Sequence, residues 1–145
     1  MDRNIVIECI GKIGILKELA TDLRTEMAEI LAGISDLRKV PMGKCWIHEH
    51  EKAPNNGYVL LEGSVIVRKS GTPDIECEAP EFLGEMMQFM PSHERTASVT
   101  ALSDCAVLRF QWDDFWKEIS AKLSPEHQEK IKEAIKNTTW AHFAQ

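Results

Sequence analysis

The stretch that decides the fold is Phe82-Leu83-Gly84-Glu85-Met86-Met87-Gln88-Phe89-Met90-Pro91-Ser92-His93-Glu94-Arg95-Thr96-Ala97-Ser98-Val99. It places one glycine, one carboxylate and one guanidinium around a short loop in an otherwise apolar run. Gly84 lets backbone N–H groups approach a bound anion closely. Arg95 offers a planar fork of donors that fits phosphate oxygens, and the Glu85 carboxylate accepts hydrogen bonds from a pair of sugar hydroxyls. The sequence therefore predicts a site for a small sugar phosphate.

The same stretch resembles the phosphate-binding cassette of cyclic-nucleotide-binding domains. That family has Phe-Gly-Glu and a hydrophobic residue, then a loop, then Arg followed by small, hydroxyl-bearing and β-branched residues. Here the two halves are Phe82-Leu83-Gly84-Glu85-Met86 and Arg95-Thr96-Ala97-Ser98-Val99. The spacing from Glu85 to Arg95 is similar to that of the bacterial catabolite activators.

Two further blocks extend the resemblance over roughly residues 38–120. Residues 57–67 resemble the family's strand pair with its Glu-Gly turn, and residues 104–110 with Phe115 resemble its last strand and the helix that follows. The fold implied is mainly β with flanking helices, a double-stranded, jelly-roll-like β-roll with N-terminal and C-terminal helices.

The resemblance also implies roles for individual residues. Arg95 would pair with the cyclic phosphate of cAMP or cGMP, Glu85 would accept the ribose 2′-hydroxyl, and the backbone of Gly84 to Met86 would face the phosphate. Thr96 permits both nucleotides and decides neither. The expected ligand-binding residues are Val67, Leu83, Gly84, Glu85, Met86, Arg95, Thr96 and Ala97, with Trp140 as a lid over the base.

Residue patterns predict three regions in a single domain covering residues 1–145. Apolar residues spaced by three and four from Ile13 to Leu37 predict helix, and Gly14 and Gly33 allow two shorter helices there. We therefore assign residues 1–37 to an N-terminal helical segment, 38–112 to the β-roll and 113–145 to C-terminal helices. The predicted strands are Cys45–His48, Tyr58–Leu61, Ser64–Arg68, Ile75–Glu78, Ala97–Ala101 and Ala106–Phe110, and Pro80–Met90 is predicted to be a loop with a short helical turn.

The C-terminal region contains two helix starts. Asp113 and Asp114 place negative charge at the positive end of a helix, and Pro125 after Ser124 suits the first turn of another. The last helix carries an apolar stripe of Ile131, Ala134 and Ile135, which must cover its own domain or meet a partner. We expect at most a weak homodimer through this helix, and cyclic-nucleotide binding that moves the C-terminal helices.

Composition excludes several function classes. With 17 basic and 23 acidic residues the formal net charge is −6, which disfavours nonspecific nucleic-acid binding. No apolar run approaches the ~20 residues needed to cross a bilayer, and the N-terminus lacks the pattern of a secretory signal. The four cysteines are far apart and form no CxxC, so we expect buried free thiols and a cytoplasmic location.

Two alternatives to nucleotide sensing stay open. Pro80 stands where the family expects Gly, and an acidic set would oppose an anionic ligand unless it points to solvent; that set is Glu76, Glu78, Glu81 and Glu94. These departures allow a ligand-free interaction module that kept the fold. His48 and His50 also share a strand face, as in metal cupins, but the carboxylate and third histidine of such a site are missing. We expect no catalysis, no metal and no cofactor, and an effector partner that the sequence does not identify.

Overall fold

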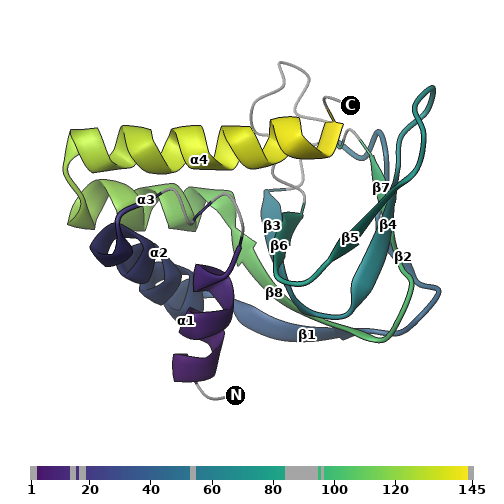
Figure 1. Ribbon diagram of the computed structural model, residues 1–145, viewed down its shortest axis with the longest axis horizontal. Coiled ribbons are helices and arrows are strands. Elements are labelled where there is room, and N and C mark those ends of the chain that lie inside the picture. The colour runs from purple at the N-terminus through teal and green to yellow at the C-terminus, as the bar shows by residue number, and fades with distance from the viewer. Residues whose placement is uncertain are drawn as a thin grey trace.

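The computed structural model describes residues 3–13, 16, 19–52, 55–83, 95 and 97–143, of which 137–143 are described as backbone only. Helices gather at one side of the molecule and strands at the other (Figure 1). The helices are α1 (Arg3–Gly11), α2 (Thr21–Ile34), α3 (Trp112–Lys122) and α4 (Pro125–Phe143). The strands are β1 (Asp36–Val40), β2 (Cys45–Ile47), β3 (Asn56–Glu62), β4 (Ser64–Arg68), β5 (Ile75–Glu78), β6 (Glu81–Leu83), β7 (Ser98–Ala101) and β8 (Cys105–Gln111).

The strands form two antiparallel four-stranded sheets, in the orders β1-β8-β3-β6 and β2-β7-β4-β5. The tight turn at Gly63, whose φ is +98°, joins β3 of the first sheet to β4 of the second. A Cβ at Gly63 would lie 2.8 Å from the carbonyl oxygen of Asp104, so this turn needs glycine for space as well as conformation. The mainly β fold with flanking helices that the sequence predicted is confirmed.

Alternation along β3 separates two cores. Tyr58 and Leu60 face the space between the two sheets, whereas Val59 and Leu61 face the helices. The interior of the roll, which we call the roll core, consists of Val40, Ile47, Tyr58, Leu60, Val65, Val67, Leu83, Ala97, Val99, Ala101, Cys105 and Val107. The helices pack on the opposite face of the first sheet, so helices, first sheet and second sheet form three layers.

The N-terminal region differs from the sequence prediction. Helix α1 already begins at Arg3, and the predicted helix from residue 13 begins only at Thr21. Strand β1 occupies Asp36–Val40, inside and across the predicted end of the helical segment at residue 37, and Leu37 is 40% exposed. The apolar spacing was misleading here because pairing with β8, a strand far along the chain, determines the local structure.

One further element was predicted wrongly. Residues Glu81–Leu83 form strand β6 on β3, whereas the sequence suggested a loop and a helical turn. Phe82 is fully buried among the helices and Leu83 is buried in the roll core, so successive side chains on the two faces of the sheet edge are both buried, which explains the strand. The rest of the predicted turn, residues 84–90, lies outside the described residues.

The other predicted strands and both C-terminal helices are present. Asp113 and Asp114 lie in the first turn of α3, and the Ser124 hydroxyl accepts a hydrogen bond from the backbone N–H of His127 at 3.3 Å at the start of α4. Ile131, Ala134 and Ile135 are buried against the helical core of their own chain. None of the described helices is long and apolar enough to cross a bilayer.

Candidate functional site

Arg95 is buried at one end of the roll core, with 4% of its surface exposed. Its Nη2 donates a hydrogen bond to the backbone carbonyl of Asn56 at 2.7 Å, and its Cζ lies 5.9 Å from the centroid of the Tyr58 ring. Burying a guanidinium is costly unless acceptors and anions compensate it. A planar cation buried at the end of the roll has the donor geometry that binds an anionic group such as a phosphate.

The backbone of Arg95 is held by the loop after β2. The N–H of Arg95 donates to the carbonyl of Glu51 at 2.9 Å, and the N–H of His50 donates to the carbonyl of Arg95 at 2.8 Å. His50 has a φ of +71°, which is in the left-handed region that non-glycine residues rarely adopt. A strained backbone conformation of this kind persists where surrounding contacts fix it. Here the left-handed conformation at His50 turns the loop so that its backbone pairs with that of Arg95.

Glu49 fastens this loop to the β4–β5 hairpin. Its carboxylate accepts hydrogen bonds from the Ser70 hydroxyl at 2.8 Å and from the Ser70 backbone N–H at 3.1 Å, while its own N–H donates to the Ser98 hydroxyl at 2.9 Å. The two Ser70 bonds hold the pKa of Glu49 below its ordinary value, and the charges of His50 and Lys69 lower the pKa further. Partial desolvation acts in the opposite direction on this pKa and is outweighed.

The apolar members of the expected site come together in the structure. Val67, Leu83 and Ala97 are all buried in the roll core, which also contains Tyr58 beside Arg95. Gly84, Glu85, Met86 and Thr96 lie outside the described residues, as does the side chain of Trp140. The backbone at residue 140 belongs to the C-terminal end of α4, which extends toward the roll (Figure 1).

Residues 55–57 connect Arg95 to the helices. Asn56 supplies the carbonyl that Arg95 binds, and the preceding Asn55 caps α3. The carbonyl of Asn55 accepts from the N–H of Trp112 at 2.8 Å, and its side-chain oxygen accepts from the N–H of Asp113 at 3.1 Å. A Cβ at Gly57 would lie 2.8 Å from Nε1 of Trp112, so glycine allows the strand to approach that indole closely.

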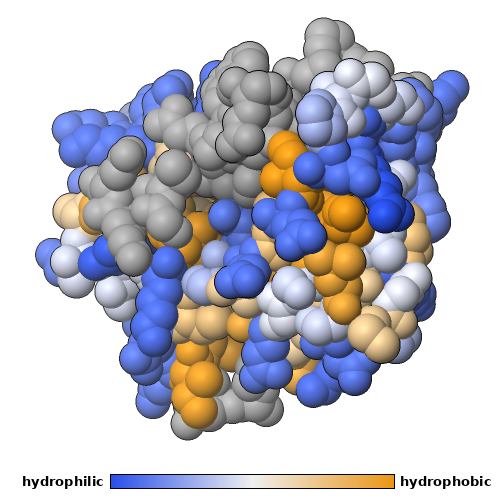
Figure 2. Space-filling view, turned by 45° about the vertical axis from the view of Figure 1, so that its right-hand side comes forward, coloured by the Kyte–Doolittle hydropathy of each residue, from blue (hydrophilic) through white to orange (hydrophobic). Residues whose placement is uncertain are grey.

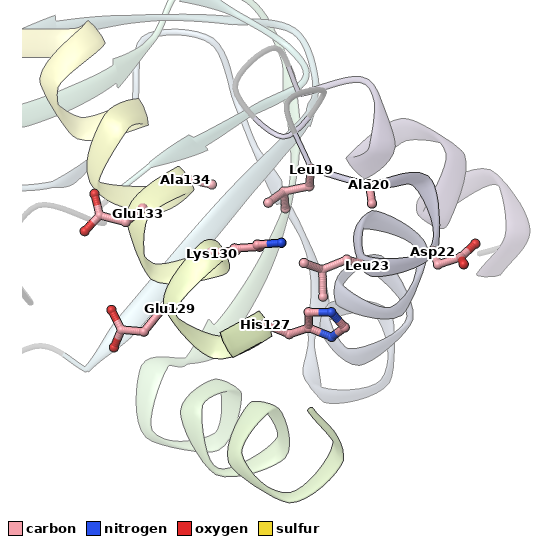
Figure 3. A pocket seen from close by; sticks show the side chains of 9 residues that line it. All are labelled: Leu19, Ala20, Asp22, Leu23, His127, Glu129, Lys130, Glu133 and Ala134. Carbon is pink, nitrogen blue, oxygen red and sulfur yellow. The ribbon is translucent and has the colours of Figure 1, made fainter. Parts of the chain in front are cut away.

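An open groove lies between α2 and α4. It has a volume of about 800 Å³ and is lined by Leu19, Ala20, Asp22, Leu23, His127, Glu129, Lys130, Glu133 and Ala134. Figure 3 shows Lys130 and His127 pointing from α4 toward Leu19 and Leu23. The described lining contains none of the expected ligand-binding residues, so the groove is separate from Arg95 and concerns how α4 rests on the N-terminal helices.

The described residues give little basis for a metal centre. Cys45 Sγ and His48 Nδ1 are 3.6 Å apart, but no group of three or more His, Cys, Asp or Glu side chains gathers within the described ranges. All four cysteines are free thiols, of which Cys105 is buried and the other three are partly exposed. Glu76 and Glu78 are exposed on β5, so these two members of the acidic set face solvent.

Comparison with known protein families shows where this fold belongs. A match to the family described as a cyclic nucleotide-binding domain covers residues 37–122, more than half of the chain. The chain belongs to the cyclic-nucleotide-binding domain family. The family resemblance seen in the cassette is thus confirmed, over almost the same range that the motifs predicted.

Individual relatives of this cyclic-nucleotide-binding domain are distant. The Pycsar effector protein XpPycTIR of Xanthomonas perforans is 27% identical over 111 residues, which are 70% of this chain and 36% of that protein. The chain therefore spans about a third of the length of this curated relative.

Solved structures agree with the fold. A cyclic nucleotide-binding domain from Methylobacillus flagellatus has a TM-score of 0.72 at 17% identity, covering 98% of this chain and 78% of that one. The regulatory domain of Toxoplasma gondii PKA with cAMP has a TM-score of 0.66 at 18% identity, covering 93% of this chain and 50% of that one. At identities this low, the structural similarity establishes the fold alone, that is, the β-roll and its flanking helices.

Sequence reasoning missed several residues around Arg95. Tyr58 and Asn56 contact its guanidinium, and Glu49 fastens the loop that pairs with its backbone. The stretch Asn55-Asn56-Gly57-Tyr58 reads as an ordinary start of a strand. Nothing in the local sequence therefore indicates that Asn56 and Tyr58 contact Arg95. They follow from the pairing of β3 with β6 and β8, which brings Asn56 and Tyr58 to the end of the roll where Arg95 enters.

Proposed function

We propose that this domain is a sensor that binds a cyclic nucleotide, cAMP or cGMP, inside the β-roll. Arg95 would hold the cyclic phosphate, Glu85 the ribose 2′-hydroxyl, and the backbone N–H groups of Gly84 to Met86 the phosphate oxygens. Val67, Leu83 and Ala97 would form the apolar wall, while Thr96 accepts either nucleotide. The proposed role is regulatory, with no chemical step at the site.

The observation that carries this proposal is the burial of Arg95 beside the Tyr58 ring, with its guanidinium bound to the Asn56 carbonyl. A solvated surface arginine would stay in water, whereas this side chain is buried against two residues of β3. The T. gondii neighbour with a similar fold was solved with cAMP, which supports the same class of ligand here. Exposure of Glu76 and Glu78 weakens the electrostatic objection that favoured a ligand-free module.

We propose that binding is transmitted to the C-terminal helices through residues 55–57. Asn56 touches Arg95 and Asn55 caps α3, so a shift of the guanidinium toward a phosphate would act on the start of α3. The groove between α2 and α4 supports the same idea, because α4 rests on the N-terminal helices with open space at its side. Trp140 would then close over the base as a lid.

The output of the sensor is an effector protein or an attached effector domain. The similarity to a protein named as an effector, of which this chain covers about a third, supports such an arrangement. Four free thiols support a reducing compartment, so we place the domain in the cytoplasm.

Calorimetric titration with cAMP and cGMP tests the proposal. We expect R95K to weaken binding at least tenfold, about 1.4 kcal/mol, because lysine lacks the planar fork of donors. R68K is the matched control, since Arg68 is exposed and its Nε lies 3.2 Å from Asp74 on the outside of the roll. Urea unfolding shows whether both variants stay folded. If the wild-type domain binds neither nucleotide at about 1 mM, the sensor proposal is wrong and the ligand-free module replaces it.

A further inference from the structure

Trp46 carries a buried N–H group that has no acceptor among the described residues. Its Nε1 is shielded from solvent and makes no hydrogen bond within that part of the chain, although the side chain as a whole is only partly buried. An indole N–H can only donate, and a buried donor without a partner is uncommon in folded proteins. Such a group calls for an explanation, and a missing ligand acceptor is one.

A β-bulge accompanies the inward position of Trp46. In the pairing of β2 with β7, Cys45 lies opposite Thr100 but Ile47 lies opposite Val99, so Trp46 is the extra residue between them. Bulges turn side chains away from simple alternation and are frequent beside binding sites. Here Ile47 belongs to the roll core and Trp46 packs against it.

Trp46 and Arg95 are both neighbours of Tyr58. The rings of Trp46 and Tyr58 meet edge to face, with centroids 6.2 Å apart and an interplanar angle of 88°, and Arg95 Cζ lies 5.9 Å from the Tyr58 centroid. Tyr58 is thus a shared neighbour of the Arg95 guanidinium and the Trp46 indole, and a ligand that extends from Arg95 past the Tyr58 ring would approach Trp46.

Trp112 provides an internal comparison, because its Nε1 is also buried with no acceptor in the described ranges. That indole is 2% exposed and lies among Phe110, Phe115 and Phe82 on the helical side of the first sheet. The backbone at Gly57 comes so close to it that even a Cβ would not fit, so no ligand can reach this N–H. Trp46 instead packs against the roll core, and its side chain as a whole is partly exposed although its Nε1 is shielded.

We propose that Trp46 is a ligand-contacting residue, whose indole N–H donates a hydrogen bond to the bound cyclic nucleotide and whose ring packs against it. This inference rests on the proposed function, and it adds a contact from β2, outside the cassette. Because the indole only donates, it favours ligands that present an acceptor at this position. A contact to the base would make Trp46 a specificity determinant, and a contact to the sugar or phosphate would make it a general affinity determinant.

The test is titration of wild type, W46F and W112F with the 3′,5′-cyclic forms of AMP, GMP, CMP and UMP. W46F keeps an aromatic ring and removes the N–H, and we expect it to weaken binding about three- to tenfold, as for one neutral hydrogen bond. W112F, which removes the equivalent orphan donor from the helical side, should bind within about twofold of wild type. Unequal losses among the four nucleotides assign the acceptor to the base, and equal losses assign it to the sugar or phosphate.

A nuclear magnetic resonance experiment gives a second readout that does not depend on the folding of W46F. The indole N–H signal of Trp46 can be assigned in the wild-type protein by elimination, using W112F, W116F and W140F. We expect this signal to shift on addition of nucleotide. If wild type binds a nucleotide, yet the Trp46 signal stays unmoved and W46F binds equally well, the assignment of Trp46 is wrong while the sensor function stands. If wild type binds none of the four, both proposals fail.

Discussion

At the scale of single residues, Glu49 is the side chain that fixes the surroundings of Arg95. The loop after β2 supplies both backbone partners of Arg95, and Glu49 ties this loop to the next hairpin through Ser70. A carboxylate that accepts two such hydrogen bonds is favoured in its ionised form, which is why its pKa is lowered. The ionised Glu49 therefore stabilises the folded state.

The sign of the resulting pH dependence follows from linkage. A carboxyl whose folded pKa is depressed contributes stability above its unfolded pKa, and this contribution is lost as the pH falls through the folded pKa. We predict that E49Q lowers the free energy of unfolding at about pH 7, and that the difference from wild type narrows as the pH falls through the lowered folded pKa of Glu49, because the wild-type carboxyl then becomes protonated too. Urea unfolding followed from neutral pH into the acidic range measures this difference, with E76Q at an exposed position of β5 as the control. A difference that does not change with pH would show that the Ser70 bonds do not depend on ionisation.

At the scale of elements, the cap of α3 joins the site to the C-terminal helices. Asn55 satisfies two N–H groups at the start of α3, while its neighbour Asn56 holds Arg95. We predict that N55A costs about 1 kcal/mol of stability, the usual loss for a helix cap. It should also reduce the effect of nucleotide on hydrogen exchange in α3 and α4, because the link between Asn56 and α3 is loosened.

The measurement is mass-spectrometric hydrogen exchange over residues 112–143, with and without nucleotide. S124A is the matched control, because Ser124 caps α4 with no contact to Asn55 or Arg95 among the described bonds. Both variants should exchange faster near their caps, but only N55A should lose the nucleotide response. Full retention of that response in N55A would mean that the signal reaches α4 by another route.

Elements also show where the sequence was sufficient. Short runs of β-favouring apolar residues around the Glu62-Gly63 turn marked β3 and β4, and the Ser124-Pro125 pair marked the start of α4, because local chemistry determines each of these features. Strand β1 was missed because all of its residues except Val40 are exposed and most of them are polar, and because it pairs with β8, which lies about seventy positions later in the chain. The inward position of Trp46 was missed because it coincides with a bulge, and bulges depend on register rather than on the residues of one strand.

At the scale of the whole molecule, the apolar stripe of α4 lies within the chain. Ile131 and Ile135 are fully buried against the other helices, so of the two alternatives that the sequence left open, this stripe covers its own domain. The face in Figure 2 shows apolar surface broken into separate patches by hydrophilic side chains. The large apolar side chains that are exposed among the described residues are Ile5, Leu37, Met42 and Leu102, which belong to different elements or turns.

This packing predicts the effect of shortening a side chain of the stripe. I131A should cost about 2–4 kcal/mol in the free energy of unfolding, because it opens a cavity between α4 and the helices beneath it. The control K132A, at an exposed position on the same helix, should stay within about 0.5 kcal/mol of wild type.

If the stripe packs within one chain, the unfolding free energies of wild type and I131A are both independent of protein concentration, since an association equilibrium would make them vary. Sedimentation at about 100 μM, with and without nucleotide, should give the same mass for both proteins. A mass that falls in I131A without a loss of stability at low concentration would instead assign the stripe to a dimer interface.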